Sequence, residues 1–342
     1  MLKVFFAPLQ GYTTGIYRKA HAEIFGGVDA YYAPFLRIEN GEPREKDIRD
    51  LECSDENSAE IANANHAKFK VVPQIIANSA SEFKILAEAL LQKGFTEIDF
   101  NMGCPFPMQV NRHRGAGLLS DIHSVQEIMD EIKRMSGPAT NSNGTASVLF
   151  SVKMRLGLES SDEAFALLPI LNDTPLAHIT LHPRLGKQQY KGAIDFNAFE
   201  RFYNECKHPL VYNGDITTVS QICEMEQHYP KLMGVMIGRG FLAHPSLAAD
   251  YKSLNEKASV NENVNAAETS QDSLDKILQM HQIIFKDASH KYQGDSQILS
   301  HVQSFWEYLE PSIPKKVFKR IKKAGKLSEY TEAVNQIKAV QP

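Results

Sequence analysis

The sequence has no long apolar run. A membrane-spanning helix needs about 20 consecutive apolar residues, and no stretch of the 342-residue chain comes close to that length. The apolar part of the first eight residues is also too short for a secretory signal peptide and is typical of a β-strand. We therefore expect a cytoplasmic protein without a membrane partner.

Cysteine is scarce as well. The chain has four, Cys53, Cys104, Cys206 and Cys223, and their wide spacing fits neither a disulfide framework nor the paired cysteines of structural zinc sites. His182 could ligate a metal, but no carboxylate or second histidine lies at ligand spacing from it. We expect reduced thiols, no bound metal and a monomeric protein.

What the sequence does contain is an alternation of strand-like and helix-like segments. Eight short runs rich in apolar, β-branched and aromatic residues are separated by stretches with helical periodicity. The runs are residues 3–7, 28–33, 71–76, 97–101, 149–154, 177–181, 210–213 and 234–237. Eight strands alternating with helices over residues 1–248 match the roughly 250 residues of a (β/α)8 TIM barrel.

An open doubly wound sheet is the competing α/β fold. It predicts a GxGxxG turn after the first strand, where a dinucleotide would bind, and the chain has Pro8-Leu-Gln-Gly11 there instead. Beyond the barrel, residues 249–272 are polar and are interpreted as a linker or insertion. Helical periodicity in residues 273–342 predicts a small C-terminal α-helical domain.

The C-terminal segment also carries a block of positive charge. The net charge of the chain is −4, yet the segment between Pro314 and Leu327 contains no acidic residue. Its basic residues are Lys315, Lys316, Lys319, Arg320, Lys322, Lys323 and Lys326. Such a block either contacts a polyanion or forms a solvated helix face, and composition alone leaves both interpretations open.

Residues suited to binding and catalysis follow the expected strands at their carboxyl ends, where a TIM barrel builds its active site. In chain order they are Pro8, Leu9 and Gln10; Gln74; Asn101 and Cys104; Lys153 and Arg155; His182 and Arg184; Asn213, Gly214 and Asp215; and Gly238 and Arg239. Stability alone does not explain such residues at seven strand ends. We therefore interpret them as one functional site.

Some of these residues suggest a specific chemistry. Gly214 and Gly238 would let backbone amides approach a phosphate, with Arg239 as a charged fork, unless both glycines only make tight turns. The proline after Cys104 keeps this residue out of a helix. A thiol with an ordinary pKa of about 8.5 can donate a proton near neutral pH, although a buried structural cysteine is the competing interpretation. Lys153 is either an ordinary surface lysine or a cation placed to stabilise negative charge in the site.

Together the segments resemble a known family. Asn101-Met-Gly-Cys104-Pro105, Val110-Asn111 and Gly115-Ala-Gly-Leu-Leu119 resemble the signature of the tRNA-dihydrouridine synthases. Further matches in the family's order are Ala7-Pro8 with Gly11, Pro73-Gln74, Val152-Lys153-Met-Arg155-Leu-Gly157, His182-Pro-Arg184 with Gln189-Tyr190 and Gly192, Asn213-Gly214-Asp215-Ile216, and Val235-Met-Ile-Gly238-Arg239-Gly240. The matches extend over residues 4–245.

The resemblance implies an FMN-dependent oxidoreductase that reduces the C5–C6 double bond of specific uridines in tRNA. It implies tightly bound FMN, contacted by Pro8, Leu9, Gln10, Gln74, Lys153, His182, Asn213, Gly214, Asp215, Gly238 and Arg239. Cys104 would protonate C5 on the face opposite to the hydride that reaches C6. NADPH would reduce the flavin again after each turnover.

The resemblance also implies that basic residues grip the tRNA backbone. The expected tRNA contacts are Asn101, Arg112, Arg114, Arg155 and Arg184 in the barrel, and Lys315, Lys316, Lys319, Arg320, Lys322 and Lys323 in the helical domain. Two other functions remain open. A small-molecule FMN oxidoreductase of the dihydroorotate dehydrogenase type would not need the basic segment. A noncatalytic tRNA-binding protein would not need the cysteine, lysine and histidine at the strand ends.

Overall fold

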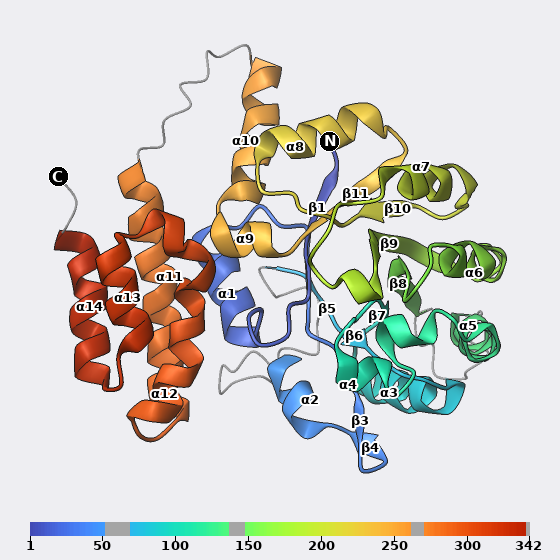
Figure 1. The fold of residues 1–342 in the computed structure, drawn as a ribbon, viewed down its shortest axis with the longest axis horizontal. Helices are drawn as coiled ribbons and strands as arrows, with labels where there is room; N and C mark the ends of the chain where they lie inside the picture. Colours follow the sequence, from blue (N-terminus) through green and yellow to red (C-terminus); the bar gives the residue numbers. More distant parts are fainter. Residues whose placement is uncertain (52–68, 137–147, 261–269, 340–342) are drawn as a thin grey trace. The chain divides into compact units, whose positions relative to one another are not determined.

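A computed structural model describes residues 1–51, 69–136, 148–260 and 270–339 (Figure 1). Within these ranges the chain forms two compact units. The first comprises Met1–Gln10, Val28–Ile216 and Ser220–Ile237, and the second comprises Gly11–Gly27, Thr217–Val219 and Gly238–Pro342. In the described part of the chain, no helix is long and apolar enough to cross a membrane.

The first unit is a parallel β/α barrel. Its strands in the described ranges are β1 (Lys3–Phe6), β2 (Ala30–Tyr32), β5 (Val71–Val72), β6 (Gln74–Ile75), β7 (Glu97–Met102), β8 (Leu149–Gly157), β9 (Leu176–Leu185), β10 (Leu210–Tyr212) and β11 (Leu232–Ile237). They are arranged in the order β5-β2-β1-β11-β10-β9-β8-β7-β6, and neighbouring strands pair in parallel. Each of the eight expected runs contains strand structure, so the predicted TIM barrel is confirmed.

The barrel closes through the third expected strand, which Pro73 divides into two. Its first half, β5, pairs with β2, and its second half, β6, pairs with β7. Proline has no N–H to donate to a sheet, but the Pro73 carbonyl accepts a hydrogen bond from the Asp99 N–H at 2.9 Å. This hydrogen bond and the pairing of β6 with β7 keep the two strands side by side despite the interruption.

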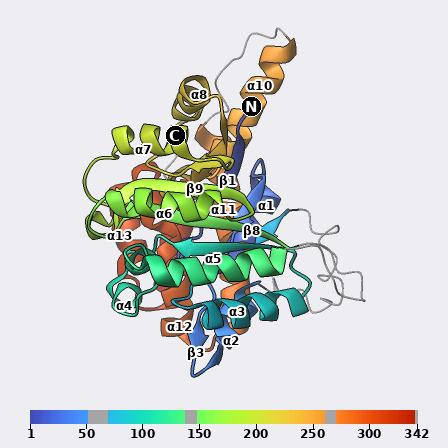
Figure 2. The same ribbon diagram turned by 90° about the vertical axis from the view of Figure 1, so that its right-hand side faces the viewer.

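Helices α3 (Ala80–Gln92), α5 (Ile122–Ser136), α6 (Asp162–Asn172) and α7 (Phe196–Glu205) lie outside the strands (Figures 1 and 2). The unit also contains α2 (Glu45–Leu51), α4 (Pro107–Val110), α8 (Val219–His228) and the 3-10 helices η2 (Gly115–Leu118) and η3 (Gly186–Gln188). Phe83 of α3 packs against the outward side chains Phe100 and Phe150, with ring centroids 5.3 and 5.5 Å apart. Because side chains alternate along a strand, the neighbouring Asp99 and Ser151 face the barrel interior.

A short antiparallel hairpin, β3 (Ile38–Glu39) with β4 (Glu42–Pro43), was not expected from the sequence. Its turn residues Asn40 and Gly41 both have positive φ, 54° and 86°. Asn-Gly is the preferred pair for this kind of tight turn. The sequence therefore carried a signal for the hairpin that strand periodicity did not detect.

The second unit is helical and includes more than the C-terminal segment. Its helices are α1 (Gly15–Ile24), α9 (Arg239–Ala243), α10 (Leu247–Val260), α11 (Ser270–Lys291), α12 (Asp295–Val302), η4 (Gln303–Ser312), α13 (Lys315–Lys323) and α14 (Leu327–Ala339). Helix α1, which follows the first strand, packs against α11. Just before α1, the Tyr12 hydroxyl donates a hydrogen bond to Glu307 at 2.8 Å. The helix after the first strand thus groups with the C-terminal helices.

The polar segment 249–272, expected as a linker, is helical at both ends. Helix α10 continues to Val260 and α11 begins at Ser270, whereas residues 261–269 lie outside the described residues. Lys, Glu, Ser and Ala are tolerated in an exposed helix, so a low apolar content did not exclude helical structure. Another polar stretch, residues 136–147 before β8, begins at the last residue of α5 and otherwise lies outside the described residues.

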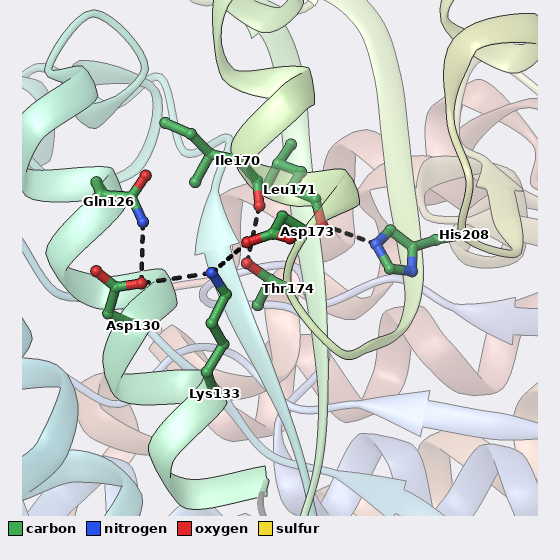
Figure 3. Close-up of polar contacts among 8 residues, drawn as sticks. All are labelled: Gln126, Asp130, Lys133, Ile170, Leu171, Asp173, Thr174 and His208. Atoms are coloured by element: carbon green, nitrogen blue, oxygen red, sulfur yellow. Dashed lines mark hydrogen bonds and ion pairs between the residues drawn. The ribbon is translucent and has the colours of Figure 1, made fainter.

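A surface cavity of about 440 Å³ lies at the amino ends of β9 and β10. Its lining includes Asn172, Asp173 and Lys207. Figure 3 shows the contacts beside it: the Lys133 ammonium donates to Asp173 at 2.6 Å, and His208 contacts the backbone of α6 at 2.8 Å. These bonds connect α5, α6 and the loop before β10. Because barrel active sites form at the opposite strand ends, we assign this region a structural role.

Candidate active site at the strand tips

Two layers of inward-facing polar side chains lie below the strand tips. In the lower layer Gln74, Asp99 and Ser151 are neighbours on β6, β7 and β8, because the register pairs Asp99 with both of the others. All three are fully buried. In the next layer Asn101 is paired with Lys153. Strand register therefore brings together side chains that are far apart in the sequence.

A continuous chain of hydrogen bonds connects Asp99 to Cys104. The carboxylate of Asp99 accepts from Gln74 Nε2 and from Ser151 Oγ, both at 2.6 Å. Gln74 Oε1 accepts from Asn101 Nδ2 at 2.7 Å. Asn101 Oδ1 then accepts the backbone N–H of Cys104 at 2.9 Å and that of the preceding residue at 3.1 Å. The backbone at the cysteine is thus anchored to the barrel interior.

The other side of Cys104 packs against a glycine-rich turn. Its carbonyl accepts a hydrogen bond from the Ala116 N–H at 3.0 Å. Gly115 has a φ of 61°, and a Cβ at this position would lie only 2.8 Å from the Cys104 Cβ. Only glycine combines this backbone conformation with so close an approach. The Gly-Ala-Gly sequence therefore helps to set the position of the thiol.

Burial raises the pKa of the Cys104 thiol. A backbone hydrogen bond at Phe106 and the positive charges of Arg155 and Lys153 act in the opposite direction but do not cancel the effect of burial. The group therefore remains a thiol at neutral pH. Such a group is a poor nucleophile but a ready proton donor.

Lys153 is a partly buried cation in the middle of β8, in the layer it shares with Asn101. Burial, with the neighbouring charge of Arg155, lowers the pKa of its ammonium group to about 8, while Asp99 and Cys104 act to raise it. Among the described residues Lys153 has no hydrogen-bonded or ion-paired partner. A cation in this state is electrostatically suited to receive an anionic group from outside the chain.

Arg155, two residues further along β8, connects the cysteine loop to β9. Its Nε donates to the Gly103 carbonyl at 3.0 Å, and its Nη1 donates to the Leu185 carbonyl at 2.9 Å. Its guanidinium also lies 5.5 Å from the ring centroid of Tyr190. Arg155 is 2% exposed, and its hydrogen bonds hold the cysteine loop against the end of β9.

Arg184 connects the tips of β9 and β10 in a similar way. It forms a two-point ion pair with the Asp215 carboxylate, in which Nη1 lies 3.0 Å from Oδ1. Its Nε and Nη2 donate to the Gly192 carbonyl at 3.0 and 2.8 Å. Nη1 also lies 3.3 Å from His182 Nε2. The side chains of His182 and Arg184 on β9 and of Asp215 after β10 therefore lie next to one another.

The arginines expected to contact tRNA differ in their environment. Arg155 and Arg184 are buried, and Arg114, which is 5% exposed, is ion-paired with Glu82. Asn101 is 7% exposed and is used by the hydrogen-bond chain. These side chains would have to break internal bonds to reach a macromolecule. Of the five barrel residues in that expectation, Arg112 has an exposed position.

The remaining expected cofactor residues fall in both units. Pro8, Leu9 and Gln10 follow β1 in the barrel, and Gly238 and Arg239 follow β11 in sequence and begin α9 in the second unit. At the tip of β10, Asn213 Nδ2 donates to the Met236 carbonyl at 2.7 Å. A Cβ on Gly214 would lie 2.8 Å from both Ile194 Cδ1 and the Tyr212 hydroxyl. Close packing therefore requires glycine at position 214.

The basic block forms the exposed face of an amphipathic helix in the second unit. Val317, Phe318 and Ile321 of α13 are buried, and five lysines, Lys315, Lys316, Lys319, Lys322 and Lys323, are exposed. Arg320 differs from them, because it donates to Gln336 at 2.5 Å and to Glu332 at 3.0 Å on α14. It therefore secures α13 to α14, while the lysines face solvent.

Sequence reasoning missed two residues that support the site, Asp99 and Ser151. The signal was present in the segment Glu97-Ile-Asp-Phe-Asn-Met102, where polar and apolar residues alternate with the period of a strand. In a barrel with helices outside, the polar positions of such a strand face inward.

Among the described residues the three cysteines are free and no group of three metal-ligating side chains occurs; Cys53 lies outside the described residues.

By its fold and its strand-tip site, the protein is a β/α-barrel enzyme. Among solved structures, the chain resembles morphinone reductase at a TM-score of 0.50 and 12% identity, covering 79% of this chain and 88% of the other. At this identity the likeness concerns the fold alone. The sequence matches the family model described as "Dihydrouridine synthase (Dus)" over residues 5–341, and the chain belongs to this family.

Relatives within the family have modest identity. A tRNA-dihydrouridine(16) synthase of Neisseria meningitidis serogroup B is 25% identical over 294 residues, which cover 85% of this chain and 82% of the relative. A probable tRNA-dihydrouridine synthase of Helicobacter pylori J99 is 34% identical over 149 residues, which cover 43% of this chain and 42% of the relative. A second H. pylori relative is matched over 49% of its length. The chain thus aligns with less than half of these two relatives.

Proposed function

We propose that this protein is a tRNA-dihydrouridine synthase that reduces the C5–C6 double bond of uridines in tRNA, with FMN as cofactor and NADPH as the source of electrons. It would act in the cytoplasm, where tRNA is modified. The observation that carries the proposal is the position of Cys104, whose backbone bonds to Asn101 at the end of β7, next to the Lys153 cation that has no internal partner among the described residues. Burial raises the pKa of the Cys104 thiol, which suits a proton donor. Membership of the dihydrouridine synthase family supports the same conclusion.

The residues at the strand tips fit FMN. Lys153 is a cation without an internal partner, which suits the edge of a reduced flavin where negative charge collects. Gln74 uses one amide hydrogen for Asp99 and has a second N–H available. Gly214 is closely packed against Ile194 and Tyr212, and Gly238 with Arg239 begins a helix suited to phosphate. Asp215 differs, since Arg184 occupies its carboxylate, and we propose that it shapes the site through that pair.

In the bound state the reduced flavin supplies the hydride that is added at C6 of the uracil ring. The Cys104 S–H supplies the proton added at C5, so one hydride and one proton saturate the double bond. The sulfur becomes a thiolate near the positive charges of Lys153 and Arg155, which stabilise it. Solvent then returns a proton to the sulfur, because the pKa of this thiol is raised.

This function is tested by incubating the purified protein with FMN, NADPH and an unmodified tRNA transcript. We expect yellow protein with FMN bound, and tRNA nucleosides that include dihydrouridine when digested RNA is analysed by mass spectrometry. A protein that takes up FMN and oxidises NADPH, but leaves every uridine unchanged, would instead support a small-molecule oxidoreductase. A colourless protein that does not bind FMN would contradict the proposal.

We propose that the exposed lysines of α13 bind the tRNA backbone. Changing Lys315, Lys316, Lys319, Lys322 and Lys323 to glutamine should weaken tRNA binding about tenfold or more near 0.1 M salt and flatten the dependence of affinity on salt, because fewer counterions are released. NADPH oxidation by the FMN-loaded protein should not change. The matched control is Arg320→Gln, which should lower thermal stability through the lost contacts to α14 and leave the salt dependence nearly intact. Equal salt dependence in the five-lysine variant and the wild type would refute the assignment.

A second RNA surface is proposed on the segment that follows Cys104. Phe106 and Met108 are 58% and 53% exposed although they are apolar, and Arg112 is exposed on the same segment. The target base has to leave its stack to reach a barrel site, and its neighbours then need new stacking partners. Phe106→Ala should therefore raise the KM for tRNA about tenfold and leave reduction of the flavin by NADPH unchanged. An unaltered KM would remove Phe106 from the RNA surface.

A further inference from the structure

The buried carboxylate of Asp99 has no role in the chemistry described above. It lies on β7 in the barrel interior with none of its surface exposed. Aspartate is rarely buried this completely without an ion pair, and here the hydrogen-bond partners of its carboxylate are the neutral side chains of Gln74 and Ser151. A group that is costly to bury and absent from the reaction calls for another explanation.

The direction of the hydrogen bonds provides one. An ionised carboxylate only accepts hydrogen bonds, so Gln74 has to turn its NH2 group toward Asp99. Its carbonyl oxygen then faces Asn101, which has to supply its own NH2 group at 2.7 Å. The Asn101 oxygen is thereby directed to the Cys104 N–H at 2.9 Å. Each amide could adopt a flipped orientation by itself. The negative charge of Asp99, at the start of the hydrogen-bond chain, permits only one arrangement of the two amides.

We propose that Asp99 is a positioning residue whose carboxylate sets the orientation of Gln74 and Asn101 and so fixes the backbone of the proton donor Cys104. The link to catalysis rests on the proposed function, whereas the positioning itself is a property of the folded chain. Without an acceptor at Asp99, the side-chain amides of Gln74 and Asn101 can flip. The NH2 group of Asn101 would then face the backbone N–H of Cys104, and no hydrogen bond could form between them. The loop would then lose its anchor to β7.

The protonation of Asp99 should affect the same bonds. Burial raises the pKa of this carboxyl to about 6, while hydrogen bonds from Gln74 and Ser151 and the charge of Lys153 oppose the effect. Tyr32 and Glu97 also face it. The folded-state pKa lies above the unfolded value of about 3.9, so ionisation costs stability as the pH rises from about 4 to 6. Below about pH 6 Asp99 becomes a donor as well as an acceptor, and the fixed direction of the chain is lost.

The rate at which iodoacetamide alkylates Cys104 tests this inference without tRNA or flavin turnover. Peptide mapping by mass spectrometry reads Cys104 separately, with Cys206 and Cys223 as references in the same molecule. Asp99→Leu should raise the Cys104 rate about 3- to 10-fold, the size expected for one lost backbone hydrogen bond. Asn101→Leu should give a similar increase, and the double variant should add little, because both changes break one chain.

The matched control is Thr180→Val, which removes a buried hydroxyl that has no hydrogen-bond partner among the described residues and should leave the Cys104 rate unchanged. If Asp99→Leu does not fold, Gln74→Met interrupts the chain at its next member and should give the same increase. In the wild type, the Cys104 rate relative to Cys206 should rise as the pH falls through about 6, and Asp99→Asn should remove that rise. A Cys104 rate that changes in Asn101→Leu but stays at the wild-type value in Asp99→Leu or Gln74→Met would overturn the proposal. Because no RNA is present, this result would leave the proposed function untouched.

Discussion

Replacing Cys104 with alanine is expected to reduce dihydrouridine formation about 100-fold or more, the usual loss when a general acid is removed, while FMN remains bound. The two effects should separate, because we propose that the sulfur donates the proton and that other residues, at the strand tips, hold the cofactor. The backbone N–H of residue 104 still bonds to Asn101 in the variant, so the loop should keep its position. Mass spectrometry of digested tRNA measures the product, and the flavin absorbance of the purified variant measures FMN content.

Two further variants sharpen this prediction. Cys104→Ser retains a hydroxyl, a far weaker acid than a thiol, and should also lose most of the product while binding FMN. Cys223→Ala removes a cysteine on α8 and should behave as the wild type. Loss of the flavin from Cys104→Ala would show that the division between proton donor and cofactor residues is wrong.

Lys153→Met is expected to have opposite effects on activity and stability. Activity should fall about 100-fold, because a preorganised charge near developing negative charge contributes on this scale. The cofactor-free variant should be more stable than the wild type by about 1–2 kcal/mol, a value reduced from the full cost of the pKa shift because the side chain is partly exposed. Thermal unfolding of the FMN-free proteins and product formation measure the two quantities.

The pH dependence follows from the lowered pKa of Lys153, about 8. Up to pH 8 both the folded and unfolded states carry the charge, and the folded state bears the cost of burying it. Between about pH 8 and 10.4 the folded protein releases this proton first, so stability should rise with pH in the wild type and not in the variant. A suitable control is Lys187→Met, since Lys187 is 52% exposed and pairs with Glu159 on the surface. A variant less stable than the wild type would contradict a buried, unpaired cation.

Much of the barrel could be predicted from sequence because strand periodicity and chain length are local properties. The runs at residues 3–7 and 149–154 are short, apolar and separated by helical stretches, and both contain strands. The position of α1 was not predictable in this way. Its own sequence fits a barrel helix, but the contacts with α11 and the bond from Tyr12 to Glu307 group it with the distant C-terminal helices.

The sequence predicted which residues lie at the strand ends of the candidate site, but not which of them form hydrogen bonds and ion pairs with one another. Sequence placed Arg155 and Arg184 near the site and assigned both to RNA because they are charged. The structure buries them against carbonyl groups and Asp215, and such partners depend on register between strands. Asp99 was missed for the same reason, since its role requires Gln74 and Ser151 on neighbouring strands.

We propose that Cys104 acts on the uracil ring and not on the reduction of the cofactor. An anaerobic stopped-flow experiment separates the two steps by following flavin absorbance, first with NADPH and then with tRNA. We predict that NADPH bleaches the flavin of Cys104→Ala at the wild-type rate and that the flavin then stays reduced after tRNA is added. Return of the oxidised flavin spectrum at the wild-type rate in this variant would contradict the account.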